Sequence, residues 1–435
     1  MNKNLHLISL GCTKNLVDSE IILGRLSQYA LIDNPSDADV IIINTCGFID
    51  AAKTESINTI LEVHEVRKED SILVVSGCLS ERYREELKQE LPEVDIFTGV
   101  GDYAVIDELI AKRENRFSPN VYLANENDQR IITGSTYHAY IKISEGCNQV
   151  CSFCAIPSFK GKLHSRPIAS IVTEVANLTK QGYYDFSFVS QDSSSYGRDL
   201  GYSEGLMDLI DGVEAIEGVK SARVLYLYPS TTTFALIDKI AASKIFQTYY
   251  DMPIQHIDER MLLTMKRGFG EAKTIELLNY MRSKPNSFIR SAIIAGHPSE
   301  TKEQFEKVCN FAKDFGFDRL SIFEYSNEET TKAYEMEQLD EDIIAQRAQI
   351  LGDIAAQTNT ASLEKLIAQT LEVVIEGESD EHEYLLSARP LGWAYEIDGD
   401  ILINDTNDRA IEYGQIYKVK VTQLAGDRLL ATILA

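Results

Sequence analysis

At 435 residues the chain is too long for one ordinary core, and typical domain sizes predict two or three domains. Its 44% hydrophobic and 25% charged residues are typical of a soluble globular protein, and no apolar run approaches the roughly eighteen residues that a membrane helix needs. The formal net charge of −25 argues against broad, unspecific binding to phosphate backbones, because lysine and arginine drive that binding. A basic protein partner suits this charge better.

The first ten residues contain one lysine and a short apolar stretch broken by His6 and Ser9, which is a poor match to a secretory signal. We therefore predict a first strand here and a cytoplasmic protein. Because seven cysteines in a reducing compartment are not expected to form a disulfide framework, metal binding becomes their leading predicted use.

Residues 1–120 repeat one pattern three times: an apolar run, a short loop with a cysteine, then a helical period. The predicted strands are Leu5–Leu10, Val40–Ile43 and Ile72–Val75, the loop cysteines are Cys12, Cys46 and Cys78, and the helices begin near Asn15, Ala51 and Glu81. This pattern predicts βα units of a parallel sheet, in an N-terminal α/β domain. The carboxyl ends of such strands share one edge, so the three cysteines are expected to converge there.

Residues 121–135 are polar and rich in turn formers, which predicts a linker. Residues 136–365 then alternate strand and helix patterns and predict a central partial (β/α)6 barrel, which places its chemistry at the carboxyl ends of its strands. The six strand candidates are Ala139–Ile143, Phe186–Val189, Ala222–Leu227, Thr248–Met252, Ile289–Ile294 and Leu320–Phe323.

Residues 366–435 change to short alternating segments separated by glycine and aspartate turns, which predicts a small antiparallel β-barrel. The predicted strands are Leu371–Ile375, Tyr384–Ser387, Ile401–Ile403 and Ile416–Val421.

Three cysteines follow the first barrel strand with the spacing CxxxCxxC: Cys147, Cys151 and Cys154. A structural zinc site normally closes with four ligands, and this loop offers three, with no histidine before His164. A four-iron cluster on three thiolates leaves one iron open for S-adenosylmethionine (SAM). A zinc loop completed by His164 or a distant residue is the alternative.

The segment 145–154 resembles the signature of the radical SAM superfamily. Segments 10–15, 44–48 and 76–78 resemble the N-terminal cysteine motifs of its methylthiotransferase family, and the match covers the whole chain. Within that family, segment 155–162 followed by Ser165-Arg166 resembles the branch that methylthiolates an aspartate of small-subunit ribosomal protein twelve, whereas the tRNA-adenosine branch differs here.

This resemblance implies two [4Fe-4S] clusters, with no catalytic residue beyond their ligands. The barrel cluster would generate the radical, and the cluster on Cys12, Cys46 and Cys78 would hold the sulfur that is inserted. One SAM would methylate the sulfur, and a second would yield the radical that removes hydrogen from the aspartate β-carbon. An electron donor protein is implied as well. The alternative for the N-terminal set is three buried free thiols.

Polar residues at the barrel strand ends are candidates for SAM binding. They are Ser190, Gln191, Asp192, Pro229, Gln255 and Gly296, and the resemblance adds Phe153 from the cysteine loop. We interpret His256 and His297 as structural, and Cys309 as a core residue because it lies on an apolar helical stripe. Segment 296–301 has a serine where the family usually has glycine, and segment 325–331 lacks its usual glycine.

The terminal barrel resembles a TRAM domain, which in the tRNA-modifying branch binds RNA. Residues 366–435 hold five basic and thirteen acidic residues, a net charge of −8, which would repel phosphate and attract a basic ribosomal protein. We therefore expect ribosomal protein twelve, free or on the ribosome, as substrate, with tRNA as the alternative. A non-catalytic iron–sulfur or zinc scaffold is the alternative from another class.

Overall fold

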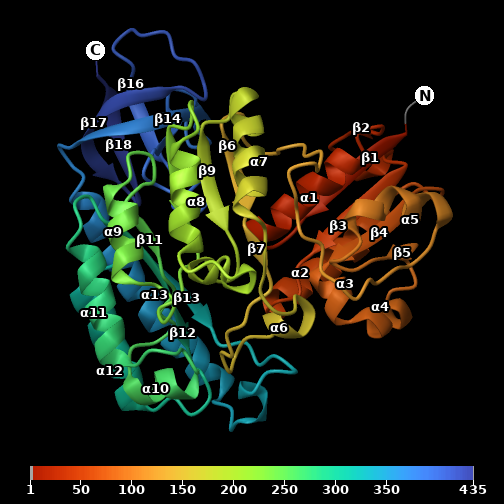
Figure 1. The fold of residues 1–435 in the computed structure, drawn as a ribbon, viewed down its shortest axis with the longest axis horizontal. Coiled ribbons are helices and arrows are strands. Elements are labelled where there is room, and N and C mark those ends of the chain that lie inside the picture. Colours follow the sequence, from red (N-terminus) through yellow and green to blue (C-terminus); the bar gives the residue numbers. More distant parts are fainter. Residues whose placement is uncertain (1–2, 435) are drawn as a thin grey trace.

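The computed structural model describes residues 3–434, which form three units along the chain (Figure 1). The N-terminal α/β unit lies beside the central barrel, and the C-terminal strands form a separate small barrel at one end of the central one (Figure 1). Within this described range, none of the helices combines the length and the apolar character that crossing a membrane requires.

The N-terminal unit is a five-stranded parallel sheet of order β2-β1-β3-β4-β5. Its strands are β1 (Asn4–Ser9), β2 (Ala30–Leu31), β3 (Val40–Thr45), β4 (Ile72–Gly77) and β5 (Ile96–Phe97). Its helices are α1 (Thr13–Arg25), α2 (Asp50–Val66), α3 (Cys78–Arg82), α4 (Arg84–Glu90) and α5 (Ile106–Lys112). The predicted α/β domain is confirmed. The strands β2 and β5 were not predicted, because two residues carry no periodicity.

The central unit is the predicted six-stranded parallel barrel, left open between its first and last strands. Its strands are β6 (His138–Lys142), β9 (Asp185–Val189), β10 (Ser221–Val224), β11 (Tyr249–Asp251), β12 (Phe288–Ala295) and β13 (Arg319–Glu324). They form two three-stranded sheets, β6-β9-β10 and β11-β12-β13, which meet where Ala222 bridges Phe246.

Helices cover the outside of this barrel (Figure 1). They are α7 (Ile168–Lys180), α8 (Gly205–Glu214), α9 (Phe234–Ala242), α10 (Glu259–Thr264), α11 (Glu271–Arg282), α12 (Lys302–Phe315) and α13 (Glu341–Glu364). The loop after β6 carries a short antiparallel pair, β7 (Ser144–Glu145) with β8 (His164–Ser165), and between them the one-turn helix α6 (Ile156–Phe159).

The C-terminal unit is a closed five-stranded barrel of order β14-β15-β16-β18-β17. Its strands are β14 (Thr370–Glu378), β15 (Leu386–Pro390), β16 (Ile401–Asp405), β17 (Ile416–Ala425) and β18 (Arg428–Ile433). The small barrel is confirmed, but the prediction of a purely antiparallel barrel is wrong for one pair: β16 and β18 run parallel. The unpredicted β18 is what closes the barrel, since it pairs with both β16 and β17.

Ion pairs join the N-terminal unit to both open edges of the central barrel. On the β6 side, Arg130 from the segment before that strand pairs with Glu20 of α1 and Glu174 of α7 at 2.5 and 2.6 Å. On the β13 side, Glu328 pairs with Arg82 at 2.6 Å and Lys53 at 3.1 Å. The N-terminal unit is therefore fastened across the gap between the first and last barrel strands.

Candidate metal centres

The N-terminal cysteines stand at the carboxyl ends of three adjacent strands. Cys12 lies between β1 and α1, Cys46 directly follows β3, and Cys78 is the first residue of α3 after β4. Because β1, β3 and β4 are neighbours in the sheet, the three thiols share one edge, as expected from the strand-end rule.

Two glycines let these three loops approach one another. A Cβ on Gly11 would lie 2.7 Å from Cys46 Sγ, and a Cβ on Gly47 would lie 2.6 Å from the Leu79 Cα. Gly11 also has a φ of 83°, a conformation that residues with a side chain rarely adopt. The loops of Cys12, Cys46 and Cys78 are thus in direct contact, which is the juxtaposition that a shared cluster requires.

Cys78 lies against the barrel's own cysteine loop. It is buried in one apolar cluster with Ala155 and Phe159, which follow the last barrel cysteine, Cys154. Burial raises the pKa of the Cys78 thiol to about 12. A metal cluster that replaces this proton would therefore also neutralise the charge of a buried thiolate.

The loop with Cys147, Cys151 and Cys154 is held by backbone hydrogen bonds from three directions. The Cys147 N–H donates to the Gly161 carbonyl at 3.1 Å. Ser152 donates its N–H to the Met265 carbonyl at 3.0 Å and accepts from the Ala333 N–H at 2.8 Å. Ser152, the residue after Cys151, is therefore fixed both to the end of α10 and to the segment after β13.

Hydrogen-bond donors point at the sulfur atoms of this loop. The Gln149 N–H donates to Cys147 Sγ at 3.4 Å, and Arg267 Nη1 donates to Cys151 Sγ at 3.3 Å. The hydroxyl of Tyr228 lies 3.6 Å from the same Cys151 sulfur. Donors of this kind are typical of cluster-bound thiolates, whose negative charge they stabilise. The residues present therefore fit a cluster on three thiolates.

The described side chains are not gathered around a single metal ion. Among residues 3–434 there is no group of three His, Cys, Asp or Glu side chains that could hold a single metal ion. A lone zinc ion would draw its thiolates to about 2.3 Å. His164, the alternative fourth ligand, lies exposed on β8, opposite Glu145.

The structure places the candidate SAM contacts as follows. Gln191 lies two residues after β9 and Gln255 lies four residues after β11, and their Oε1 atoms are buried without a hydrogen-bond partner in the described chain. Phe153 packs edge-on against His297 with ring centroids 6.2 Å apart. These two glutamine oxygens are therefore available as hydrogen-bond acceptors.

Other candidates are occupied by protein contacts. Asp192 accepts hydrogen bonds from Gln149 Nε2 at 2.8 Å and from the Ser195 N–H and hydroxyl, so it ties the cysteine loop to β9. Ser190 Oγ bonds Ser193 Oγ at 3.1 Å. Pro229 is buried. Gly296 has a φ of 80°, and a Cβ there would lie 2.7 Å from the Ile344 side chain.

The two histidines and the seventh cysteine are all engaged by protein groups. His256 Nε2 lies 3.1 Å from Glu300 Oε1, and His297 Nε2 lies 3.1 Å from Ser152 Oγ in the cysteine loop. Burial lowers the pKa of His297 to about 4, so the ring is neutral at physiological pH. Cys309 packs against the apolar core of the barrel.

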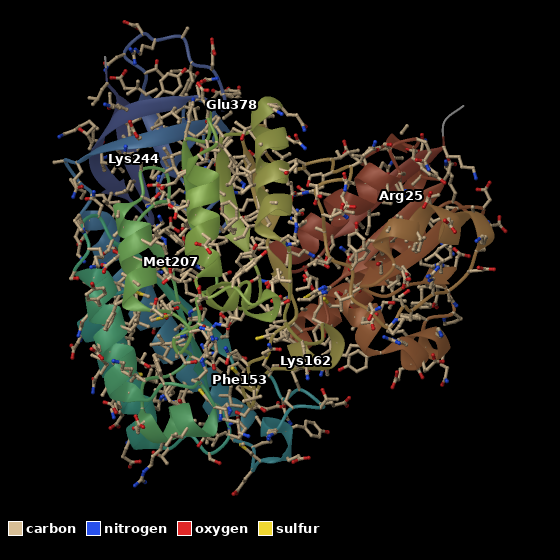
Figure 2. The ribbon with its side chains drawn as sticks, in the orientation of Figure 1. Arg25, Phe153, Lys162, Met207, Lys244 and Glu378 are labelled. Carbon is tan, nitrogen blue, oxygen red and sulfur yellow. The ribbon has the colours of Figure 1, made fainter. Side chains whose placement is uncertain are left out.

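Sequence reasoning missed Arg267, which is 5% exposed and stacks over the Tyr228 ring at 4.3 Å from its centroid. Its partner Cys151 is 116 residues away in the chain, and an arginine after a helix carries no distinguishing signal. Figure 2 shows Lys162 on the side of the cysteine-loop region nearer the N-terminal unit and Phe153 toward the lower end of the barrel.

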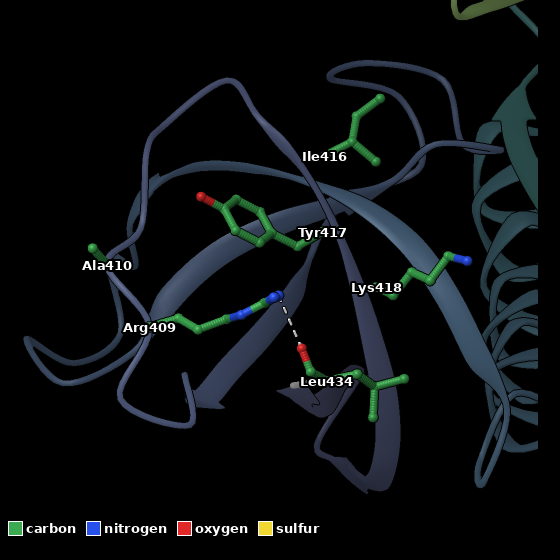
Figure 3. A pocket seen from close by; sticks show the side chains of 6 residues that line it. All are labelled: Arg409, Ala410, Ile416, Tyr417, Lys418 and Leu434. Carbon is green, nitrogen blue, oxygen red and sulfur yellow. Dashed lines mark hydrogen bonds between the residues drawn. The ribbon is translucent and has the colours of Figure 1, made fainter.

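A hollow of about 640 Å³ lies on the C-terminal barrel and is lined by Arg409, Ala410, Ile416, Tyr417, Lys418 and Leu434 (Figure 3). Arg409 Nη1 donates to the Leu434 carbonyl across it at 3.0 Å. The acidic barrel therefore has a locally basic depression, remote from both cysteine sets. The acidic Glu378, Asp380 and Glu381 are exposed, as expected.

A partial parallel barrel with three cysteines on the loop after its first strand defines a radical SAM protein. The family model of the radical SAM superfamily matches residues 141–312. The model described as "Uncharacterized protein family UPF0004" matches residues 4–99, and the TRAM domain model matches residues 367–434.

The full-length relatives show which family within the radical SAM superfamily this chain resembles. "Ribosomal protein uS12 methylthiotransferase RimO" of Sulfurovum sp. (strain NBC37-1) is 69% identical over 99% of this chain and 98% of its own. The protein of the same name from Aliarcobacter butzleri (strain RM4018) is 60% identical over the same shares. The chain belongs to the RimO family of ribosomal protein uS12 methylthiotransferases, enzymes of the radical SAM superfamily.

Solved structures share the fold at low sequence identity. The methyltransferase TsrM from Kitasatospora setae, solved with tryptophan and a SAM analogue, superposes with a TM-score of 0.54 at 13% identity, over 74% of this chain and 73% of that one. The cobalamin-dependent enzyme OxsB, with aqua-cobalamin and SAM bound, gives 0.51 at 12% identity, over 81% of this chain and 56% of that one.

Proposed function

We propose that this enzyme transfers a methylthio group to the β-carbon of an aspartate in ribosomal protein uS12, in the cytoplasm. The observation that carries the proposal is the proximity of the two three-cysteine segments, because Cys78 of one shares a buried apolar cluster with Ala155 and Phe159, which follow the other. Removing hydrogen from an unactivated carbon and then supplying sulfur to it needs two such centres close together.

Each domain has a separate role in the proposed reaction. Residues 1–120 would hold the sulfur-bearing cluster, residues 136–365 would bind SAM, and residues 366–435 would meet the substrate, with residues 121–135 joining the first two. Because Arg130 and Glu328 fasten the first domain over the barrel's open edge, the two cysteine sets would stay in register during turnover.

Cys147, Cys151 and Cys154 would hold one [4Fe-4S] cluster. When bound there, this cluster and SAM supply the radical that removes hydrogen, after one electron from a donor protein. The chain orients the site: Arg267 and Gln149 donate hydrogen bonds to two of the ligand sulfurs, and Gln191 and Gln255 offer buried Oε1 acceptors without a partner in the described chain. The remaining SAM contacts we propose are Phe153, Ser190, Asp192, Pro229 and Gly296.

Cys12, Cys46 and Cys78 would hold the second [4Fe-4S] cluster. Thiolate ligands favour iron–sulfur clusters over hard cations such as magnesium. The apolar surroundings of Cys78 exclude water from this side of the site, which protects sulfur that awaits transfer. The position beside the barrel's cysteine loop supports a role in sulfur insertion.

The decisive experiment gives the anaerobically reconstituted enzyme SAM, dithionite and both substrates, purified uS12 and tRNA. We expect a mass gain on one aspartate of uS12, with release of 5′-deoxyadenosine. A mass gain on tRNA adenosine alone would show that the enzyme belongs with the tRNA-adenosine branch instead. Absence of 5′-deoxyadenosine would show a non-catalytic scaffold.

The cluster assignment has its own test. Reconstituted wild-type protein is expected to hold about eight iron atoms, and replacing Cys147, Cys151 and Cys154 with alanine should remove about half. Cys309→Ala is the matched control, because Cys309 packs against the core of the barrel and its loss should leave the iron content unchanged. A triple variant that retains all its iron, or zinc as the bound metal, contradicts the assignment.

A further inference from the structure

Four charged side chains form a closed ring in the interface between the N-terminal domain and the barrel. Lys142 pairs with Asp18 and, at 3.0 Å, with Glu145. Lys160 pairs with Glu145 at 3.1 Å and with Asp18 at 3.7 Å. All four side chains are at most 5% exposed. We call Asp18, Lys142, Glu145 and Lys160 the charge ring.

Each member of the charge ring is tied to a cysteine site. Asp18 lies on α1, the helix that Cys12 begins, and Lys142 ends β6 before the barrel's cysteine loop. Glu145 stands two residues before Cys147. Lys160 follows Phe159, whose side chain packs in one cluster with Cys78. The ring therefore joins segments that carry or adjoin both cysteine sets.

Stability alone does not account for such a ring. Burying four charges costs solvation free energy, and apolar residues of similar volume are often as stable or more stable in such places. A closed ring of alternating charges fixes one relative position, or register, of the two domains. Any shift of one domain against the other would leave a buried charge without its partner. Sulfur transfer between two centres depends on that register.

We propose that the charge ring is a positioning device that holds the Cys12, Cys46 and Cys78 site over the barrel's cysteine loop, with Lys160 as the positioning residue whose charge acts on the Cys78 side. This inference rests on the proposed function, and deepens it. The Arg82 and Lys53 contacts to Glu328 complete the device on the opposite edge of the barrel.

The test compares Lys160→Met with Lys160→Arg and with Lys162→Met. Lys162 is an exposed residue of the same segment, so it is a matched control. We expect Lys160→Met to lower the amount of methylthiolated uS12 formed per 5′-deoxyadenosine at least tenfold. Lys160→Arg should restore this ratio to within threefold of wild type, and Lys162→Met should leave it unchanged.

A second measurement needs no substrate. The reduction potential of the N-terminal cluster, followed by EPR in protein that lacks the barrel cysteines, should fall in Lys160→Met and rise in Asp18→Asn. A reduced cluster carries more negative charge, so the ammonium favours it and the carboxylate opposes it. Damage to the structure would not shift the potential in opposite directions.

If Lys160→Met fails to fold, the neutral pair Asp18→Asn with Lys160→Met replaces it in the coupling measurement. A coupling ratio within twofold of wild type in either protein overturns the inference, as do equal shifts of potential in the two single variants. A wild-type enzyme that forms no methylthiolated uS12 would refute the proposed function, and the two potentials would still decide whether the ring acts on the Cys78 site.

Discussion

Arg267 donates a hydrogen bond to Cys151 Sγ at 3.3 Å while its second nitrogen, Nη2, donates to the Pro253 carbonyl at 2.6 Å. The guanidinium is thus held in place by a backbone group and directed at a sulfur that we assign to the SAM-binding cluster. A fixed, buried positive charge at this position stabilises the more negative, reduced form of a cluster.

Arg267→Met should therefore make the barrel cluster harder to reduce. We expect a more negative midpoint potential in an EPR-monitored titration, slower SAM cleavage with a weak reductant, and partial recovery in Arg267→Lys. Arg260→Met, an exposed arginine on the neighbouring helix α10, is the control. An unchanged potential in Arg267→Met would show that this hydrogen bond does not act on the cluster.

Two residues adopt left-handed backbone conformations in the segments that depart from the family pattern. Ser299 has a φ of 66°, and Thr330, which is β-branched, has a φ of 68°. Such conformations favour glycine and cost other residues roughly 1 kcal/mol or more. Thr330→Gly should thus raise the free energy of unfolding by about 1 kcal/mol, because it relieves this strain. The greater conformational freedom of glycine in the unfolded chain offsets part of that gain. Chemical denaturation of the metal-free chain measures this.

The control for that substitution is Thr173→Gly, in the middle of helix α7, where glycine should destabilise by roughly 0.3 to 0.5 kcal/mol. If Thr330→Gly is as destabilising as this control, then the Thr331 and Glu328 contacts of the loop, and not backbone strain, dominate its stability.

Sequence reasoning succeeded where a local rule fixes the spatial arrangement. The carboxyl ends of adjacent parallel strands share an edge, so Cys12, Cys46 and Cys78 could be predicted to converge although 66 residues separate the first from the last. The six barrel strands could be predicted because each carries a continuous apolar run. The parallel pairing of β16 with β18 could not, because strand direction follows from how the barrel closes.

The contacts around the cysteine sites could not be predicted from the sequence, because they join residues that are far apart in the chain. Lys142 and Asp18 are 124 residues apart, and each was indistinguishable from a solvated charge until the interface buried it. The carboxylate of Asp192, a candidate SAM contact, also accepts hydrogen bonds from Gln149 and Ser195, and its position after a strand did not predict these bonds. Whether a polar strand-end residue faces a ligand or its own loop depends on the loop's backbone path.

The C-terminal barrel docks on the central barrel through a buried carboxylate. Asp185 of β9 pairs with Arg389 of β15 at 2.6 Å and with Arg223 of β10 at 2.7 Å. Burial alone would raise the pKa of Asp185, but the two guanidinium groups outweigh it and lower the pKa to about 2. The carboxylate form therefore stabilises the folded chain.

The sign of the pH effect follows from this lowered pKa. The stabilisation is complete above the unfolded value near 3.8 and disappears as the pH falls through about 2, a change of about 2 kcal/mol. Asp185→Asn should destabilise the metal-free chain by about 3 kcal/mol at pH 7, with a smaller difference from wild type at pH 3. Urea denaturation at both pH values measures this, and a difference that grows on acidification would contradict the assignment.

Changing one N-terminal cysteine should separate the two half-reactions. Cys46→Ala is expected to abolish methylthiolated uS12 while 5′-deoxyadenosine still forms, because Cys46 belongs to the N-terminal domain and the SAM loop belongs to the barrel. Cys151→Ala is the contrasting variant and should abolish both products. Full methylthiolation by Cys46→Ala, measured by mass spectrometry, would remove the N-terminal site from sulfur insertion.

The acidic surface of the C-terminal barrel should govern the encounter with the substrate. Glu378, Asp380 and Glu381 are exposed, and Figure 2 shows Glu378 at the end of the molecule where this barrel lies. Attraction between exposed opposite charges weakens within a screening length of about 8 Å at physiological salt. Binding of the basic uS12 should therefore weaken steeply from low to physiological ionic strength, while tRNA binds poorly throughout.

Reversing those three residues to lysine should slow association with uS12 and flatten its salt dependence, with SAM cleavage at the distant cysteine loop unchanged. The matched control reverses three exposed acidic residues of the N-terminal domain, Glu62, Glu65 and Glu69, which gives the same change in net charge. Surface-binding kinetics at two salt concentrations compare the variants. Equal slowing in both would assign the effect to net charge alone, and slowing in neither would place the uS12 contact on an uncharged surface.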